Sequence, residues 1–148
     1  MTSIVEIDIA APRARVADLF SDPANNPKWM SDIERCEPVN GTLGMPGSTY
    51  RLVPKSGNRV FVATVLSKDL PDELRLRLEA PNVVVSIVDR FVATSPEVTR
   101  LVSEEEFRFK GVVNSMLGFL AQPAIKKAHR RHMDAFKQFV EHELLRER

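Results

Sequence analysis

The sequence predicts an α+β domain in which a curved antiparallel sheet of about seven strands packs around one long C-terminal helix. Segments with alternating apolar and polar residues recur through most of the chain before Gly111, as expected of half-buried strands. The later segments are separated by turns too short to hold a crossover helix, which favours antiparallel hairpins. Beyond Gly111 the apolar residues follow helical spacing instead.

The N-terminal part is expected to form one strand and two short helices. Residues 3–9 alternate between apolar and polar side chains, the pattern of a half-buried strand. Pro12 is tolerated at the start of a helix, because its missing N–H would have no partner there. The apolar positions of this helix are Val16, Leu19 and Phe20. Asp22-Pro23 ends it, and residues 25–33 suit a second short helix or turn.

A six-strand meander is expected to follow. Residues 34–53 are rich in Pro and Gly, so their strands are brief and join at a turn near Gly44. Four longer strand candidates come next, over residues 59–68, 74–80, 83–93 and 98–109. Because the turns between them are short, each strand is expected to pair with the one before it.

The C-terminal part is expected to be a long amphipathic helix over residues 115–143. Its apolar side, projected at helical spacing, carries Leu117, Ala121, Ala124, Ile125, Ala128, Ala135, Phe136 and Phe139. Pro123 would remove a backbone hydrogen bond inside this helix, so either the axis bends near Gln122 or the main helix begins there. Since no linker-like stretch interrupts the chain, residues 1–148 are expected to form one domain.

Composition and charge limit the classes of function. The chain is 43% hydrophobic and 28% charged, as in globular proteins. With 21 basic and 20 acidic residues the net charge is +1, so nucleic acid is not an expected partner, and no global charge attracts an anionic membrane. No segment approaches the ~20 apolar residues that cross a bilayer, so stable membrane insertion is not expected. A lone Cys36 and the lack of an apolar leader predict a cytoplasmic location.

Several short motifs occur in a distinctive order along the chain. They are Val5-x-Ile7 leading into Ile9-Ala10-Ala11-Pro12, Val16-x-x-Leu19-Phe20-Ser21-Asp22-Pro23, Lys28-Trp29, Val98-Thr99-Arg100-Leu101, and Phe107-x-x-x-Gly111 before the final helix. In this order and spacing, nearly the whole chain resembles the SRPBCC group. The same group is also called the START-like, Bet v 1-like or polyketide cyclase/dehydrase-like superfamily.

The resemblance implies the helix-grip fold, with the sheet wrapped around the last helix. It also implies a small hydrophobic ligand, such as a sterol, lipid or polyketide, held in the space between them. It implies no particular reaction, because members range from transport and sensing proteins to aromatase/cyclases, and no catalytic motif of the group matches this chain residue by residue. The sequence has no Gly-rich phosphate loop and no nucleophile elbow, and no cofactor is expected.

The lining of the expected pocket follows from the phase of each element. Alternate residues of the strands over 74–80 and 98–109 should face inward, together with the apolar side of the last helix. The ligand-binding residues predicted in this way are Leu76, Leu78, Leu101, Ser103, Glu105, Phe107, Ala128, His132 and Phe136.

Glu105 is the acidic candidate for chemistry in the pocket. A carboxylate on an apolar face is costly to desolvate unless it is paired or protonated, so an inward Glu105 would either react or anchor a polar end of a ligand. The alternative is a β-bulge over residues 104–106 that turns these side chains to solvent.

His132 is the second candidate for chemistry. Its helical angle points to the supposed cavity, where an imidazole can act as acid, base or hydrogen-bond donor. The alternative is a structural hydrogen bond at the end of the apolar stripe. His129 lies nearer the boundary of the stripe and is assigned no role. His129 and His132 share part of a helix face, but no Cys or acidic neighbour in the sequence completes a site, so no metal is expected.

Three functions remain as hypotheses. The first is binding or carriage of a small hydrophobic molecule in the internal cavity. The second is a polyketide cyclase or dehydratase-type enzyme in which Glu105 or His132 moves protons. The third is a protein-interaction module with a filled interior and an exposed apolar patch. The basic run over residues 126–131 is expected on the solvated back of the helix, with a surface for an acidic partner as the alternative.

Overall fold

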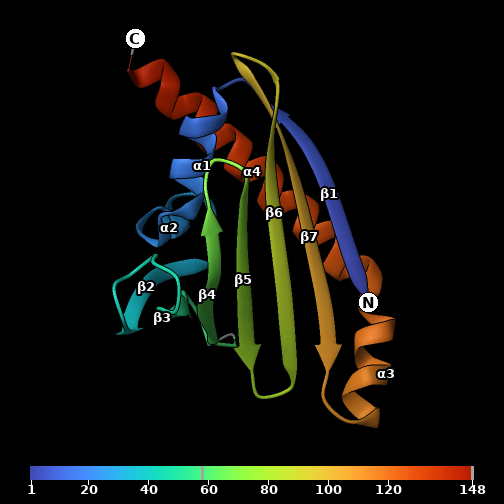
Figure 1. The fold of residues 1–148 in the computed structure, drawn as a ribbon. Coiled ribbons are helices and arrows are strands. Elements are labelled where there is room, and N and C mark those ends of the chain that lie inside the picture. Colours follow the sequence, from blue (N-terminus) through green and yellow to red (C-terminus); the bar gives the residue numbers. More distant parts are fainter. Residues whose placement is uncertain (58, 148) are drawn as a thin grey trace.

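The computed structural model describes residues 1–57 and 59–147. Its elements in chain order are β1 (Thr2–Ile9), α1 (Arg13–Ser21), η1 (Pro23–Asn25), α2 (Asn26–Trp29), β2 (Ile33–Asn40), β3 (Thr49–Pro54), β4 (Phe61–Asp69), β5 (Glu73–Ala80), β6 (Val83–Ser95), β7 (Val98–Phe109), α3 (Val112–Leu120) and α4 (Gln122–Arg146). Figure 1 shows α4 running across one face of a bent sheet, which confirms the predicted α+β helix-grip fold.

The sheet has seven antiparallel strands in the order β1-β7-β6-β5-β4-β3-β2. Strands β2 to β7 form the predicted meander, and β1 pairs with β7 so that Val5 lies opposite Ser103. Breaks in register occur in β2, in β4 and at the end of β6. Such irregularities bend strands, which helps the sheet to curve around the helix.

The helices after β1 are shorter than the sequence predicts. α1 forms as expected behind Pro12, but the short helix or turn expected over residues 25–33 forms only as the one-turn helix α2, which follows the 3-10 turn η1. Pro27 sits in the first turn of α2, where it has no intrahelical hydrogen bond to lose. Ile33 already belongs to β2, so the helix could not extend to it.

The long C-terminal helix is interrupted at Ala121, where α3 ends and α4 begins. Of the two alternatives for Pro123, the structure has the main helix beginning there, with the proline in its first turn. The apolar side predicted from one continuous helix is wrong in its first part, since Leu117, Ala121 and Ala124 are exposed, whereas the predicted residues from Ile125 onward are half-buried or buried. The residues of α4 that are buried are His129, Met133, Phe136 and Val140.

The core is densest where α1, α2 and α4 meet the sheet. Phe136 lies at its centre, with its ring edge-on to Phe20 at 4.8 Å and to Trp29 at 5.2 Å between ring centroids. Phe91 of β6 completes the cluster from the sheet side, 5.7 Å from Phe20. This cluster fills one end of the space between sheet and helix and leaves the other end to the cavity.

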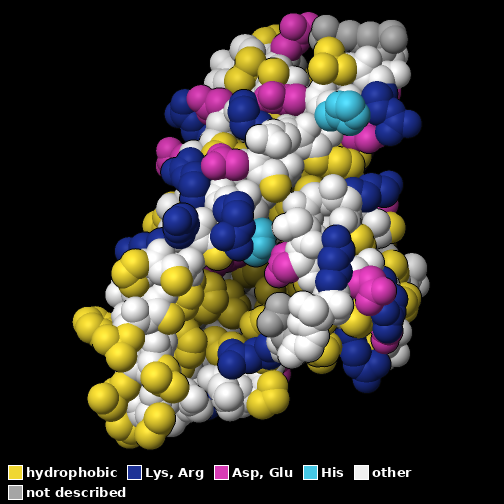
Figure 2. Space-filling model, turned by 180° about the vertical axis from the view of Figure 1, so that it is seen from behind, with side chains coloured by type: hydrophobic (Ala, Val, Ile, Leu, Met, Phe, Trp, Pro, Cys, Tyr) yellow, Lys and Arg dark blue, Asp and Glu magenta, His cyan; other side chains and the backbone are white. Residues whose placement is uncertain are grey.

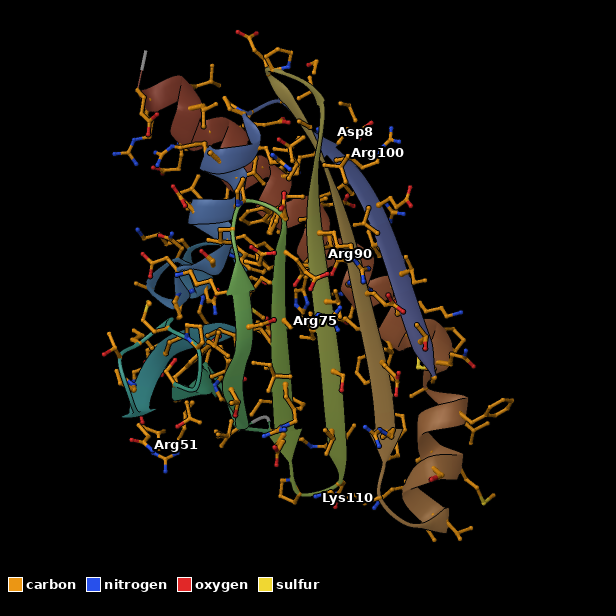
Figure 3. The ribbon with its side chains drawn as sticks, viewed as in Figure 1. Asp8, Arg51, Arg75, Arg90, Arg100 and Lys110 are labelled. Carbon is orange, nitrogen blue, oxygen red and sulfur yellow. The ribbon has the colours of Figure 1, made fainter. Side chains whose placement is uncertain are left out.

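The outer face of the sheet carries many charged side chains. Arg100 pairs with Asp8 across β1 and β7 at 2.9 Å, while Arg75 and Arg90 both contact Glu73, at 2.6 Å and 3.2 Å. Figure 3 shows these arginines on the face of the sheet opposite α4. Exposed pairs of this kind contribute little to stability, so their main effect is to keep this face solvated.

Candidate ligand cavity

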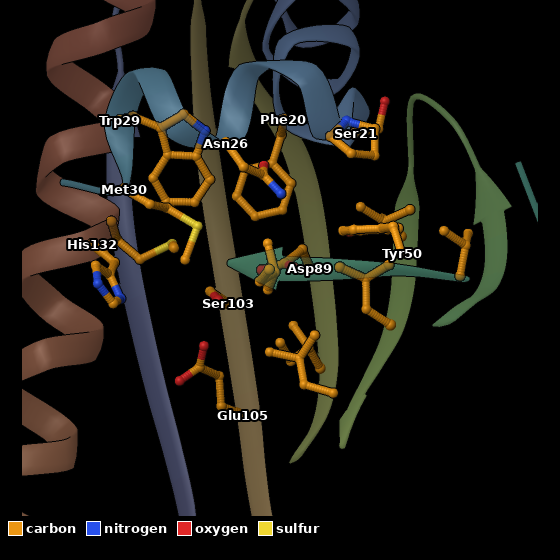
Figure 4. Close-up of a pocket in the computed structure, with 18 residues that line it drawn as sticks. Phe20, Ser21, Asn26, Trp29, Met30, Tyr50, Asp89, Ser103, Glu105 and His132 are labelled. Atoms are coloured by element: carbon orange, nitrogen blue, oxygen red, sulfur yellow. The ribbon is translucent and has the colours of Figure 1, made fainter. Parts of the chain in front are cut away.

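A cavity of two adjoining chambers, which share part of their lining, lies between the sheet and α4. The outer chamber has a volume of about 620 Å³ and opens to solvent, whereas the inner chamber, of about 80 Å³, has room for a few water molecules only. Figure 2 shows the outer chamber as a hollow with an apolar interior, and Figure 4 shows the inner one. The side chains that line both chambers are Met30, Leu52, Leu78, Glu105 and His132.

Seven of the nine predicted ligand-binding residues line these chambers. Leu76 and Ser103 line the inner chamber, and Phe107 and Ala128 the outer one. The residues shared by both chambers include the other three, Leu78, Glu105 and His132.

Leu101 and Phe136 lie in the core instead of on the lining of either chamber. The reason is their position along the elements. The inward positions of β7 before Ser103 are fully buried where α1 contacts β7, and Phe136 points into the aromatic cluster. Alternation in the sequence gives the face of a strand, but it does not say where along that face packing ends.

Glu105 points into the cavity. β7 pairs with β6 without a break from Val98 to Phe109 except beside Ser95, and Ile87 lies opposite Glu105. The β-bulge considered for residues 104–106 therefore does not occur. The side chain of Glu105 is 19% exposed, and burial raises the pKa of its carboxyl to about 7. At neutral pH this group thus exchanges readily between its protonated and ionised forms.

Asp89 is a second acidic group in the cavity, one that the sequence analysis did not select. It lies on β6 opposite Ser103, is fully buried, and lines the inner chamber. Burial raises its pKa to about 8; the neighbouring Ser103 hydroxyl offsets part of this rise and the charge of Glu105 adds to it. Within the described residues, neither carboxyl oxygen of Asp89 has a hydrogen-bond partner in good geometry.

His129 connects three elements in the floor of the cavity. Its Nδ1 is 2.8 Å from the Ser3 hydroxyl of β1, and its Nε2 is 2.9 Å from the Ser103 hydroxyl of β7. Burial, followed by the charges of His132 and Arg130, lowers the pKa of His129 to about 4. The ring is therefore neutral, so one nitrogen donates and the other accepts, and the two serines take opposite roles.

His129, expected nearer the boundary of the apolar stripe, is buried instead. The helical projection began at residue 115 and ran through the break at Ala121, which displaced the inward face of α4 toward His132. The Glu105 Oε1 atom lies 3.7 Å from Nδ1 of His129, beyond hydrogen-bonding distance but close enough for small movements to join the two groups.

His132 stands where the two chambers meet. Its side chain is 24% exposed, and its Nε2 lies 3.4 Å from an Asp32 carboxylate oxygen at the rim. Burial lowers the pKa of His132, while Asp32 raises it in part. Figure 4 shows the His132 ring among the side chains that line the inner chamber, a position that suits contact with a ligand entering it.

The inner chamber also contains a buried donor. The indole Nε1 of Trp29 is shielded from solvent and has no hydrogen-bond partner among residues 1–57 and 59–147. Together with Asp89, it gives this small space two polar groups that lack partners, in surroundings of leucine, valine and phenylalanine side chains. Buried polar groups are nearly always hydrogen-bonded, so their state here indicates a place for a polar atom from outside the chain.

Neither a metal site nor a membrane-crossing helix is found in the described part of the chain. No group of three or more His, Cys, Asp and Glu side chains there is arranged to hold a metal ion. No helix there combines the length and the apolar character needed to cross a bilayer.

Comparison of the sequence with known families identifies the class of protein. Residues 2–141 match the family described as polyketide cyclase/dehydrase and lipid transport. The chain belongs to this family, as its resemblance to the SRPBCC group predicted. A comparison with curated proteins finds no sequence match.

Solved structures agree on the fold. The chain is similar to the Zhui aromatase/cyclase from a Streptomyces species, with a TM-score of 0.77 and 17% identity over 97% of this chain and 95% of that one. It is also similar to a START superfamily protein from Mycobacterium smegmatis (TM-score 0.74, 17% identity, 99% of each chain). A third similar structure is norcoclaurine synthase from Thalictrum flavum, in complex with dopamine and hydroxybenzaldehyde. Its TM-score is 0.70 and its identity 17%, over 95% of this chain and 87% of that one. At these identities the likeness shows the fold alone.

Proposed function

We propose that this protein binds a small, mainly apolar molecule in the cavity between the sheet and α4, for carriage or storage. The observation that carries the proposal is the outer chamber itself. Its volume of about 620 Å³ lies in the range of small-molecule sites, and most of its wall is apolar. An unfilled interior of this size also argues against the third hypothesis, an interaction module with a filled core.

The polar groups of the cavity suggest what kind of molecule fits. With a pKa of about 8, Asp89 carries little negative charge just below neutral pH, whereas Glu105, with a pKa of about 7, is close to half ionised there. A ligand with an uncharged oxygen at its inner end, such as a hydroxyl or carbonyl, would accept from the indole N–H of Trp29 and share a hydrogen bond with Asp89. The rest of such a ligand would occupy the outer chamber.

The cytoplasm is the location that we propose with this function. It rests on the free thiol of Cys36, since cysteine without a disulfide partner suits a reducing compartment.

Native mass spectrometry followed by denaturing extraction tests the binding function directly. A reproducible small apolar molecule that travels with the protein would support it. A panel of fatty acids, sterols and aromatic polyketides should contain compounds that raise the melting temperature, because a ligand that binds only the native state stabilises it. If no molecule is retained and no compound in the panel shifts the melting temperature, the proposal is overturned.

Filling the outer chamber is expected to abolish binding. Ala128 is half-buried on the chamber wall, so the ring introduced by Ala128→Phe would occupy ligand volume. We expect affinity for a compound found by the panel to fall by more than about tenfold in isothermal titration. Ala124→Phe is the matched control, because Ala124 is exposed one turn earlier on α4 and its substitution should leave binding unchanged. Equal affinity in both variants would place the ligand elsewhere.

A second candidate function is an enzyme of the polyketide cyclase or dehydratase type. The observation that favours it is Glu105, a carboxyl with a pKa of about 7 that faces an apolar cavity. Such a group can remove a proton from carbon between two ketones and return it to a departing hydroxyl.

If the protein is such an enzyme, Glu105→Gln should lower the rate at which it forms an aromatic product from a linear poly-β-ketone thioester by about 10²- to 10⁴-fold. Binding of the compound should persist, because glutamine keeps the shape of the side chain. Glu104→Gln is the control, because the side chain of Glu104, next to Glu105 on β7, faces the outer side of the sheet beside Arg90. A wild-type protein that binds the thioester without converting it would leave carriage as the function.

A further inference from the structure

The helix α3 presents a surface of exposed apolar side chains. Over Val112–Leu120 the sequence contains no charged residue. The side chains between 58% and 78% exposed form what we call the α3 patch, made of Val112, Val113, Met116, Leu117, Phe119 and Leu120. Single exposed apolar residues are common, but six on one short helix mark a surface that contacts something else.

The exposure of these side chains follows from the way α3 packs against β7. Gly118 is its only buried residue and rests on the ring of Phe109, so close that a Cβ atom there would lie 2.4 Å from the ring. The Ser115 hydroxyl donates to the carbonyl of Gly111 at 2.7 Å, and the Asn114 amide donates to Lys110 at 2.9 Å. The smallest residue thus faces the sheet, and the large apolar residues face outward.

The chain around α3 is strongly basic, although the whole protein is nearly neutral. Residues 107–133 contain no Asp or Glu. The basic residues in this stretch, all exposed, are Arg108, Lys110, Lys126, Lys127, Arg130 and Arg131. Lys110 lies at the end of β7, next to α3, as Figure 3 shows. A surface that combines apolar side chains with a local excess of positive charge complements anionic lipid headgroups above an apolar interior.

The α3 patch lies next to the mouth of the cavity. Ile125 and Ala128, in the first turns of α4 after α3, line the outer chamber together with Phe107 of β7. Figure 2 shows the apolar side chains of this end of the molecule beside the hollow. Any partner that contacts the α3 patch would therefore lie next to the cavity entrance.

We propose that the α3 patch docks reversibly onto the surface of an anionic lipid bilayer, with the surrounding lysines and arginines at the headgroups. The patch has apolar side chains without hydrogen-bonding groups, and basic residues flank it in the chain on both sides, which suits a fluid lipid surface better than a shaped protein partner. Docking would also bring the cavity mouth to the lipid surface, so that an apolar ligand could pass between the two. This last step rests on the binding function proposed above.

Vesicle flotation tests the docking. The wild-type protein should float with vesicles of phosphatidylcholine and phosphatidylserine, less with phosphatidylcholine alone, and less as salt is added. The double substitution Phe119→Ser with Leu120→Ser should abolish flotation while the melting temperature stays unchanged, because both side chains are exposed. Leu145→Ser, an exposed leucine at the far end of α4, is the matched control and should float like the wild type.

Charge reversal gives an independent readout. Lys126→Glu with Lys127→Glu should weaken binding to the anionic vesicles by roughly fivefold or more per residue, with little effect on neutral vesicles. The Ala128→Phe variant, whose outer chamber is filled, should float like the wild type. Failure of the cavity proposal can therefore be distinguished from failure of the docking proposal.

Three outcomes would overturn the docking proposal. The first is absence of flotation with anionic vesicles, and the second is flotation that the serine substitutions do not reduce. The third is self-association in analytical ultracentrifugation, without flotation, that the same substitutions remove. That result would assign the α3 patch to a second copy of the chain.

Discussion

Replacing Phe136 by alanine is expected to lower the free energy of unfolding by about 3–5 kcal/mol. The side chain is fully buried and makes edge-to-face contacts with Phe20 and Trp29, so its removal leaves a cavity in the densest part of the core. Urea unfolding followed by tryptophan fluorescence measures the loss, and Trp29 supplies the signal from within the cluster. The milder Phe136→Leu should lose less and keeps the test usable if the alanine variant does not fold.

Phe119→Ala is the matched control for this deletion. The same atoms are removed from a ring that is 73% exposed, so the change in stability should stay within about 0.5 kcal/mol. Equal losses in the two variants would mean that Phe136 lines open space instead of filling the core. Ligand affinity should change little in Phe136→Leu, because Phe136 does not line either chamber.

The stability of the protein is expected to fall as pH rises from about 6.5 to about 8. The native pKa values of Asp89 and Glu105, about 8 and about 7, lie above their ordinary values of 3.8 and 4.5. The native state therefore keeps protons that the unfolded chain has released, and the stability they contribute at low pH is lost as these carboxyls ionise. Each group accounts for a slope on the order of 1 kcal/mol per pH unit until its native pKa is reached.

His129 has the opposite effect at lower pH. Its native pKa of about 4 lies below its ordinary value of 6.5, so the unfolded chain binds a proton that the native ring does not. This makes stability rise between pH 4 and 6.5 and offsets part of the carboxyl effect there. Above pH 6.5 the offset ends, and the decline caused by the two carboxyls should be seen clearly.

The substitution Asp89→Asn separates the contribution of Asp89 to the pH dependence of stability from those of Glu105 and His129. Asparagine has nearly the same shape and no ionisation, so the variant should be more stable than the wild type at pH 8, with a shallower decline above pH 6.5. Urea unfolding at a series of pH values measures both quantities. Parallel curves for the two proteins would mean that Asp89 is not protonated in the native state, and the polar end proposed for the ligand would then have to tolerate a negative charge.

The fold could be predicted largely because its strands are simple. The period-two pattern of β1, β5 and β7 and the short turns between later strands determine a meander without reference to distant contacts. The failures occurred where local signals compete. Residues 25–33 contain both a helix start and the first residue of β2, and Pro123 begins a helix that was projected as continuous from residue 115.

The candidate site was predictable only in part. Glu105 and Ser103 followed from the alternation of β7, and the same rule applied to β6 would have found Asp89, between the buried Ile87 and Phe91. His129 was missed because its face depends on where α4 begins, and the projection from residue 115 ran through that start. The exposure of the α3 patch depends on a tertiary contact, the packing of Gly118 on Phe109.

The pairing of β1 with β7 has a consequence for the order of folding. The Asp8–Arg100 contact spans 92 residues and the Ser3–His129 hydrogen bond spans 126, whereas every other pair of neighbouring strands is consecutive in the chain. Closing such a long loop costs more chain entropy than forming a hairpin, so β1 is expected to join after the meander has formed. By the same reasoning β1 is the strand most easily released from the native sheet, and hydrogen exchange should find its amides opening first.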